Sequence, residues 1–312
     1  MKLLVTGADG FVGRHLVRRL AREGHRIGAG CRPGAAPVDW QGADVTLLPL
    51  ELTEDRSVRH AVQFGPDAVV HLAAVASNPE ALADPGLAWT VNGAGTARLA
   101  QALAEGREQG GGEGRLLVVS SGEVYGAGAR VARKETDAVA PATPYAASKV
   151  GAELAGLEVW RRTGLPVIVT RSFTHTGPGQ DGRFVLPSFV ARLREARATG
   201  ERGVRTGNLD PVRDLLDVRD VVEAYVLLLR AGQPGEIYNV SRGEGTSVGE
   251  LFRMLAELIG VEVEPEPDPA LVRRDDIPHL VGDSTKLRRA TGWAPARTLP
   301  QTLRGLVDAE AD

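Results

Sequence analysis

Short apolar runs alternate with longer amphipathic stretches over roughly the first 170 residues of the chain. The runs suit buried strands, and they lie at 2–6, 25–30, 45–50, 67–74, 115–121 and 166–172. After the first run, Val12, Leu16 and Leu20 fall at helical spacing. Further helices are expected at 55–64, 87–105 and 144–164. This alternation predicts an α/β fold, a doubly wound parallel sheet of the Rossmann type with crossover helices.

The alternation of apolar runs and amphipathic stretches ends after residue 172, where loops rich in glycine and proline appear. The remaining elements expected from the pattern are helices at 184–198, 217–231 and 247–259, two short helices at 284–295 and 299–310, and a strand at 236–240 that rejoins the sheet. The segment 261–278 is too rich in proline for a core and should wrap the surface. Residues 1–172 are therefore predicted to form a dinucleotide-binding domain, and residues 173–312 mainly a substrate-binding lobe.

Composition narrows the class of protein. The 312 residues are 43% hydrophobic and 25% charged, with a net charge of −3, and no apolar run approaches the roughly 18 residues of a membrane span. The N-terminus lacks the apolar core of a secretory signal. A single cysteine, Cys31, and six histidines without metal-ligand spacing give no metal motif. We expect a cytoplasmic protein that binds no metal, nucleic acid or membrane.

A glycine motif directly follows the first predicted strand and opens the first predicted helix. In TGADGFVG, Gly7 suits the tight turn, Gly10 lets a pyrophosphate approach the backbone, and Gly13 allows close packing of the helix on the strand. The helix N-terminus then offers free N–H groups and a positive dipole end to the phosphates. The alternative is a set of ordinary turn glycines, but the position between strand and helix favours a dinucleotide-binding site.

The end of the second predicted strand bears on the choice of cofactor. NAD-binding proteins place an acidic residue there for the ribose 2′-hydroxyl, whereas this chain has Gly30, Cys31 and Arg32. Arg32 could pair with a 2′-phosphate, or it could be a solvated loop arginine. NADP(H) is therefore favoured, and NAD(H) stays possible.

Tyr145 and Lys149 stand four residues apart just after Pro144. On a helix they share one face, so the phenol and the ammonium can serve the same reacting atom. Ser121 ends the fifth predicted strand, at the sheet edge that presents residues to ligands, and could hydrogen-bond the same oxygen. Taken singly, a helix start with a solvated lysine and a turn-forming serine would explain these residues.

Together these features resemble the extended short-chain dehydrogenases/reductases that act on nucleotide-activated sugars. The motifs that carry the resemblance are TGADGFVG (6–13), HLAA (71–74), VNGAGT (91–96), VVSSGEVYG (118–126), PYAASK (144–149), TRSFTHTGPGQ (170–180) and YNV (238–240). The resemblance implies that Ser121, Tyr145 and Lys149 form the catalytic trio. It also implies a cofactor site made of Gly7, Asp9, Gly10, Phe11, Val12, Gly13, Arg32, Leu52, Leu72, Ala73, Ala74, Asn92, Tyr145 and Lys149.

The C-terminal third, through the stretches 207–225 and 277–295, is most similar to GDP-4-keto-6-deoxy-D-mannose reductases and next to GDP-mannose 4,6-dehydratases. This similarity implies that Arg213 and Arg273 grip the substrate diphosphate, as planar guanidinium groups do well. Surface arginines are the alternative. The loop 182–189, with Val185, would hold the nucleobase. Thr174 stands where most relatives have asparagine, so a substrate contact is altered there.

The sequence thus predicts an NADPH-dependent reduction of the C4 ketone of a nucleotide-linked 4-keto-6-deoxyhexose, with GDP-rhamnose as product. Glu123 keeps open a dehydratase or epimerase with retained NAD, because dehydratases need a base at C5; Gly122 stands where a second acid would be. A catalytically silent NADP-binding sensor is the alternative from another class. A nucleotide-diphosphate sugar is the expected partner, and the family implies a homodimer formed by the helices near 90–104 and 145.

Overall fold

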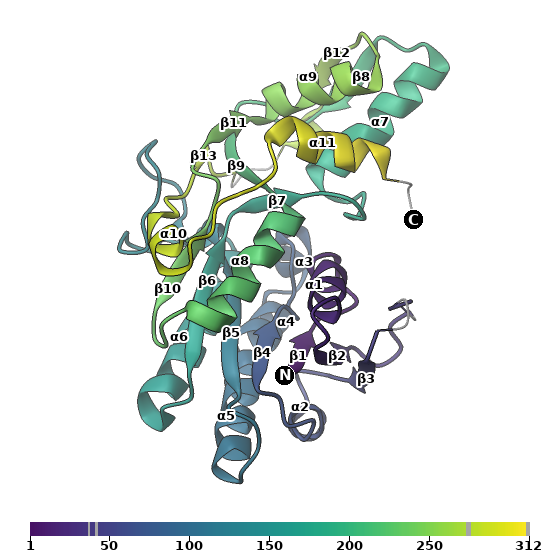
Figure 1. Cartoon of the computed structure of the whole chain (residues 1–312). Coiled ribbons are helices and arrows are strands. Elements are labelled where there is room, and N and C mark those ends of the chain that lie inside the picture. Colours follow the sequence, from purple (N-terminus) through teal and green to yellow (C-terminus); the bar gives the residue numbers. More distant parts are fainter. Residues whose placement is uncertain (37, 41–42, 273–275, 310–312) are drawn as a thin grey trace.

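A seven-stranded parallel sheet forms the centre of the molecule in the computed structural model, which describes residues 1–36, 38–40, 43–272 and 276–309 (Figure 1). Its strands are β1 (Lys2–Thr6), β2 (Arg26–Cys31), β3 (Val45–Pro49), β4 (Ala68–His71), β5 (Arg115–Ser121), β6 (Val167–Ser172) and β10 (Ile237–Val240). The strand order is β10-β6-β5-β4-β1-β2-β3. The prediction of a doubly wound parallel sheet is confirmed, and the strand at 237–240 pairs in parallel with β6.

Helices cover both faces of this sheet. The covering helices are α1 (Phe11–Ala21), α8 (Val218–Ala231) and α10 (Thr285–Thr291) on one face, and α2 (Asp55–Val62), α5 (Gly95–Glu108) and α6 (Pro144–Thr163) on the other. Each face buries its own apolar cluster, with Leu16 and Val221 in one and Leu99 and Leu157 in the other. Strands covered on both sides must be apolar throughout, which is why they read as continuous runs rather than alternating ones.

The order in which the chain adds strands reverses between β1 and β4, although all the strands run parallel. From β1 the chain moves outward to β2 and β3, while β4, β5 and β6 follow on the other side. Such a switch point leaves a crevice at the carboxyl ends of the two central strands, where doubly wound sheets bind their ligands. The glycine motif after β1 and the HLAA segment after β4 both start at this edge.

Smaller sheets and helices make up most of the chain after residue 172. The strands are β7 (Thr174–Thr176), β8 (Gly203–Thr206), β9 (Val212–Asp217), β11 (Gly245–Ser247), β12 (Glu264–Pro267) and β13 (His279–Leu280), and the helices are α7 (Val185–Thr199), α9 (Val248–Ile259) and α11 (Leu299–Asp308). Figure 1 shows this part above the large sheet. Its helices share an apolar cluster of their own, which includes Phe189, Phe252 and Leu303.

The proline-rich segment was predicted to wrap the surface, but part of it forms β12 alongside β8. Pro265 and Pro267 alternate with residues whose N–H groups donate: Glu264 N bonds Arg202 O at 2.7 Å and Asp268 N bonds Thr206 O at 2.8 Å. The prolines thus occupy positions at which no N–H group is needed for a hydrogen bond to the neighbouring strand. An edge strand can accept proline in this way. The segment lies at the surface as predicted, since none of residues 261–272 is buried, but the prediction did not include the strand.

The helix expected at 87–105 is interrupted. Before α5 the chain forms α3 (Asn78–Ala83), a short α4 (Pro85–Ala88) and then a π-helical turn, η1 (Trp89–Ala94). Such a turn widens the helix by one residue and often occurs at functional sites. It brings Asn92 to face the interior, where it is 1% exposed. Among the described residues, no helix combines the length and apolar character that crossing a bilayer would demand.

Candidate active site

The glycine loop after β1 can hold a dinucleotide phosphate. Gly7 has φ +66°, and a Cβ there would lie 2.9 Å from the amide nitrogen of Ala73. A Cβ on Gly13 would lie 2.2 Å from the carbonyl oxygen of Gly7, so only glycine allows this packing. Gly10 caps α1 without any side-chain hydrogen bond, and Phe11 begins the helix. A helix N-terminus that follows a closely packed glycine loop offers the free N–H groups that phosphate binding requires.

The structure places other members of the predicted cofactor set near the carboxyl edge of the sheet. Val12 and Leu72 pack against the apolar cluster beneath α1, and Leu52 is buried against Gly95. Ala74 is half-buried after β4.

Arg32 follows β2 and is exposed, while its neighbour Cys31 is buried. Burial, helped by the adjacent charge of Asp9, raises the pKa of the Cys31 thiol to about 11. Asp9 thus lies beside the Cys31 thiol. Arg14 donates a 2.8 Å hydrogen bond to the main-chain carbonyl oxygen of Asp9. A guanidinium and a carboxylate both lie near the end of β2, where the adenosine ribose would sit.

A buried histidine ties the two central strands together. The hydroxyl of Thr6 accepts hydrogen bonds from the amides of Leu72 and Ala73, each at 3.1 Å, so its proton is directed to His71 Nδ1 at 2.8 Å. His71 Nε2 then donates to Thr96 at 3.1 Å. Burial, with the nearby Lys149 charge, lowers the pKa of His71 to about 3. His71 is therefore a neutral structural residue that fixes the HLAA segment beside the glycine loop.

The predicted catalytic trio converges at the carboxyl end of β5. Tyr145 is the second residue of α6, whose first turn is capped by the hydroxyl of Thr143. The Tyr145 phenol lies close enough to the Ser121 hydroxyl, at the end of β5, for Ser121 to affect its pKa. Lys149, one turn further along α6 and 7% exposed, donates a 2.9 Å hydrogen bond to the carbonyl of Val119. The structure thus brings together the three residues that the sequence singled out.

Burial sets the charge states of this trio. It raises the pKa of the Tyr145 phenol, and the nearby Glu123 carboxylate raises it further, whereas the Ser121 hydroxyl lowers it. Burial lowers the pKa of Lys149 to about 8, against the opposing charge of Glu153. Tyr145 is accordingly a protonated phenol beside an ammonium close to its titration point. A protonated phenol near a lysine ammonium has the groups that a general acid requires.

Glu123 lies in a short 3-10 turn, η2 (Gly122–Tyr125), directly after β5. Its carboxylate accepts a 2.8 Å hydrogen bond from the side chain of Asn78, at the start of α3, and its amide donates to the Ser121 hydroxyl at 3.2 Å. The carboxylate is half-buried and close enough to Tyr145 to affect the phenol. Glu123 thus lies near Tyr145, and its partner Asn78 was not indicated by the sequence.

Asn92 supports α6 from the π-helical turn. Its side chain bonds both main-chain groups of Val75, at 2.8 and 3.1 Å, and donates to the Ser148 hydroxyl at 2.8 Å. Ser148 in turn bonds the carbonyl of Tyr145 at 2.8 Å. Asn92 was predicted to contact the cofactor; in the structure its amide holds the loop after β4 to the first turn of α6, which positions Tyr145.

The predicted substrate residues lie in the part of the chain after β6. Thr174 is exposed on β7, and Val185, 41% exposed, begins α7. Arg213 on β9 is paired with Asp276 and also donates to the carbonyl of Ile277 at 2.6 Å. Arg273 lies outside the described residues. The guanidinium expected to grip a diphosphate thus has a carboxylate partner within the chain.

Sequence reasoning missed several residues around this centre. His175 on β7 stacks its ring parallel to that of Phe11, with centroids 6.2 Å apart, and bonds the carbonyl of Phe173 at 2.9 Å. Glu153 and Arg171 form a buried ion pair at 2.8 Å behind Lys149. A signal for Glu153 was present, because it continues the spacing of four that links Tyr145 and Lys149.

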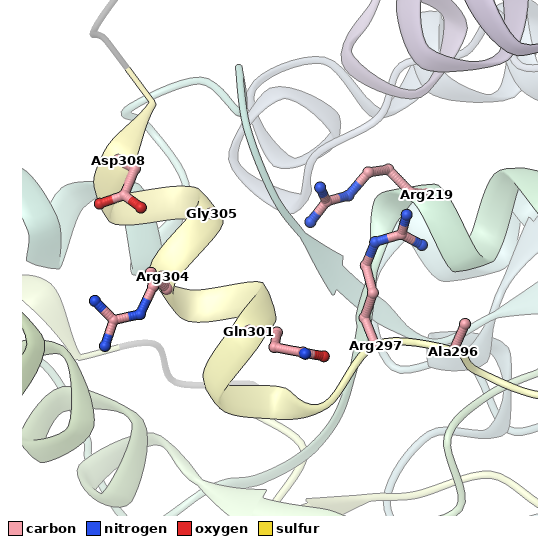
Figure 2. Close-up of a pocket in the computed structure, with 7 residues that line it drawn as sticks. All are labelled: Arg219, Ala296, Arg297, Gln301, Arg304, Gly305 and Asp308. Atoms are coloured by element: carbon pink, nitrogen blue, oxygen red, sulfur yellow. The ribbon is translucent and has the colours of Figure 1, made fainter.

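A pocket of different character lies between the start of α8 and α11. Figure 2 shows the residues that line it: Arg219, Ala296, Arg297, Gln301, Arg304, Gly305 and Asp308. Arg219 pairs with Asp217 at 2.7 Å and Arg297 with Asp220 at 2.7 Å, so buried carboxylates already neutralise two of its arginines. None of the predicted site residues that the structure describes lines it.

Known proteins resemble this chain over almost its whole length. GDP-6-deoxy-D-mannose reductase from Pseudomonas aeruginosa is 37% identical, over 98% of this chain and 96% of its own length. The structure of RMD from Pseudomonas aeruginosa complexed with NADPH matches with a TM-score of 0.83 at 36% identity, covering 98% of this chain and 97% of that one. UDP-glucose 4-epimerase from Thermus thermophilus, in complex with NAD, matches with a TM-score of 0.87 at 30% identity, covering 99% of this chain and 98% of that one.

The family model of the NAD dependent epimerase/dehydratase family matches residues 3–241, which span the glycine loop, the trio and β10. The family expected from the motifs is confirmed, and with it the oxidoreductase class. This chain belongs to the NAD dependent epimerase/dehydratase family of extended short-chain dehydrogenases/reductases.

Proposed function

We propose that this protein reduces the C4 ketone of GDP-4-keto-6-deoxy-mannose to GDP-rhamnose, with NADPH as reductant. The observation that carries the proposal is the meeting of Tyr145, Ser121 and Lys149 at the sheet edge beside the glycine loop. The 37% identity to a GDP-6-deoxy-D-mannose reductase supports the substrate class. The match to RMD complexed with NADPH supports the cofactor.

In the proposed mechanism Tyr145 donates its phenolic proton to the oxygen that forms from the C4 ketone. Ser121, which lies near the phenol, also polarises that oxygen. Lys149 stabilises the phenolate left behind, since a nearby ammonium favours the charged form of the phenol. When bound, NADPH supplies the hydride. The chain's own task is thus to position one proton donor and to stabilise its conjugate base.

Arg32 supports the preference for NADPH. It is exposed at the end of β2, where an arginine can pair with the 2′-phosphate. Asp9 lies beside Cys31 at the same strand end, and its carboxylate could serve the ribose 2′-hydroxyl of NAD. NAD therefore stays the alternative cofactor, in line with the NAD-bound epimerase neighbour.

The residues after 172 form the proposed substrate-binding lobe, with β10 returning to the large sheet. Arg213 and Arg273 would bind the diphosphate, while Val185 and Thr174 would lie against the nucleotide and the sugar. Arg213 must then exchange Asp276 for the diphosphate. A guanidinium suits both partners, because each offers two oxygens to its planar fork.

A dehydratase that retains NAD is the second candidate, and Glu123 is the observation that favours it. Its carboxylate is held by Asn78 and lies close to Tyr145. A base in this place could take the C5 proton after oxidation at C4. Gly122 offers no second acid beside it, so reduction remains the first proposal.

We also propose a homodimer that forms through α6 and the helices beside it. The side chains of Leu82, Leu87, Trp89 and Leu154 are 53%, 43%, 48% and 59% exposed on α3, α4, η1 and α6. Large apolar side chains gathered on neighbouring helices are typical of an interface. A cytoplasmic location completes the proposal, in keeping with the free thiol of Cys31.

The deciding experiment supplies purified protein with GDP-4-keto-6-deoxy-mannose and either NADPH or NADH. Consumption of NADPH together with formation of GDP-rhamnose, identified by chromatography and NMR, is the expected result. Turnover of GDP-mannose without added reductant would instead establish the dehydratase. The absence of both activities would refute the proposed substrate.

A further inference from the structure

Glu153 extends the Tyr145 and Lys149 series by one more helical turn, and its carboxylate is fully bonded. Arg171 on β6 reaches it through Nη2 at 2.8 Å and Nε at 3.0 Å, and the hydroxyl of Ser120 donates to it at 2.6 Å. Glu153 is 3% exposed and Arg171 5% exposed. Such a buried charge pair is tolerated only when its geometry is satisfied.

Other elements hold the arginine in place. Its guanidinium lies over the ring of Tyr125, 4.9 Å from the centroid, and donates to the carbonyl of Glu135 at 3.4 Å. Tyr125 is itself fixed by a 2.7 Å hydrogen bond to Asn239 on β10. The position of the Glu153 carboxylate is thereby set by β5, β6 and η2 together.

Three successive residues of β5 bind three residues spaced four apart on α6. The carbonyl of Val119 accepts from Lys149, the hydroxyl of Ser120 donates to Glu153, and the hydroxyl of Ser121 lies near the phenol of Tyr145. One strand end thus fixes the proton donor, the ammonium and the carboxylate as a unit. Because Glu153, Lys149 and Tyr145 lie on the same helix, a shift of α6 that moved Glu153 relative to β5 would also move Lys149 and Tyr145.

Burial lowers the pKa of Lys149, and the negative charge of Glu153 opposes this effect. From β4, His71 faces the ammonium but is neutral, because burial lowers its pKa to about 3. Glu123 on η2 acts on Tyr145, and Tyr225 on α8 is a neutral phenol whose pKa burial raises.

Arg171 faces this group from β6 as a second cation. With Glu153 in place, Arg171 is paired with it at 2.8 Å, and Glu153 is the charge that acts on Lys149. Without it, the positive charge of Arg171 would add to the cost of a charged Lys149.

We propose that Glu153 is a positioning residue for catalysis, which keeps Lys149 in place and charged beside Tyr145. It touches neither substrate nor cofactor and acts through the lysine. This inference rests on the proposed function for its role in turnover, but the coupling of Glu153 to Lys149 can be measured without any reaction.

The chain offers a direct measurement because it has four lysines, Lys2, Lys134, Lys149 and Lys286. Protein labelled with ¹³C at lysine gives a small set of Cε signals, and the one missing in Lys149→Met belongs to Lys149. Its titration midpoint should lie near pH 8 in the unaltered protein. In Glu153→Gln we expect it to fall by about one pH unit or more.

Three further variants separate charge from structure. Glu153→Asp keeps a carboxylate and should restore the midpoint, at least in part. Glu158→Gln removes an exposed glutamate from the same helix, paired with Arg162 at the surface, and should leave the midpoint unchanged. Should Glu153→Gln fail to fold, the double variant with Arg171→Met removes both buried charges, and its midpoint should still lie below that of the unaltered protein.

The reaction supplies the second readout. The alkaline fall of kcat/KM for the ketone should move to lower pH in Glu153→Gln, in the same direction as the lysine midpoint. An unchanged midpoint in a folded Glu153→Gln or double variant would overturn the inference, and so would a shifted midpoint without a shifted pH profile. Unaltered protein that does not reduce the ketone would refute the proposed function instead, while the titration would still decide whether Glu153 holds the charge of Lys149.

Discussion

Arg213 on β9 is paired with Asp276, which lies three residues before β13. The same guanidinium also bonds the main-chain carbonyls of Val212 at 2.9 Å and Ile277 at 2.6 Å. The two side chains are 18% and 25% exposed, so the pair is partly shielded from water. Asp276 would therefore compete with the substrate diphosphate for the guanidinium of Arg213, if Arg213 binds the diphosphate as proposed.

Replacing Asp276 by Asn should lower the KM for the nucleotide sugar, because the carboxylate no longer competes for Arg213. A partly exposed ion pair is worth about 1 kcal/mol, which corresponds to roughly a 5-fold change. Arg213→Gln should raise KM by about 10-fold or more. Steady-state kinetics measures both, with Arg205→Gln, from an exposed pair on β8, as control. A raised KM in Asp276→Asn would mean that Asp276 orients the arginine for the substrate.

Tyr145→Phe should reduce turnover by roughly 100-fold or more, because the ring remains while the transferable proton is lost. Cofactor binding, measured by fluorescence titration, should change little. Tyr238→Phe, which removes a hydroxyl bonded to the amide of Gln233 on the far side of β6, is the matched control and should keep full turnover. Near-normal activity in Tyr145→Phe would refute the role of proton donor.

The preference for NADPH over NADH should be about 10- to 150-fold in kcat/KM, since one charge-assisted contact from Arg32 is worth about 1.5–3 kcal/mol. Arg32→Asp should reverse it. The exposed Arg56 on α2 offers a control, and Arg56→Asp should leave the preference intact. Equal efficiency with both cofactors in the unaltered protein would show that Arg32 is a surface residue only.

Local sequence signals predicted the large sheet and the centre of the site. Buried parallel strands appear as apolar runs, a glycine loop has fixed spacing, and Tyr145 and Lys149 share a helix face by periodicity alone. Each of these features is decided within a few residues of chain, so a single sequence shows it.

Contacts between distant segments could not be predicted in this way. The partner of Glu153 is Arg171, one strand away, and the pairing of Arg213 with Asp276 depends on β13 lying beside β9. The π-helical turn at Asn92 also escaped prediction, because tertiary bonds to Val75 and Ser148 stabilise a geometry that local propensity does not favour. Short strands such as β7 exist only through their partners.

Replacing Leu154 by Glu should shift the protein from dimer to monomer, because a charge would then face the apolar interface proposed for α6. Sedimentation analysis at several concentrations measures this directly. Leu47, on the edge strand β3, is similarly exposed at 62%, and Leu47→Glu should leave the dimer intact. An unaltered protein that sediments as a monomer throughout would refute the proposed dimer.

Glu123→Gln should separate the two candidate reactions. Amide and carboxylate are nearly isosteric, so Asn78 can still bond the side-chain oxygen and the fold is kept. Reduction of a preformed 4-ketone needs one proton donor, and we therefore expect most of the activity to remain. Loss of a C5 base would instead abolish dehydration.

The assay for this prediction uses GDP-mannose as sole substrate in D₂O without added NADPH. We expect no deuterium at C5, because Gly122 leaves Glu123 without the neighbouring acid that would help to expel the C6 hydroxyl. Deuterium at C5 together with loss of the C6 oxygen, both absent in Glu123→Gln, would replace the reductase by the dehydratase. The same preparation must then contain tightly bound NAD, since a dehydratase returns the hydride that it removes from C4.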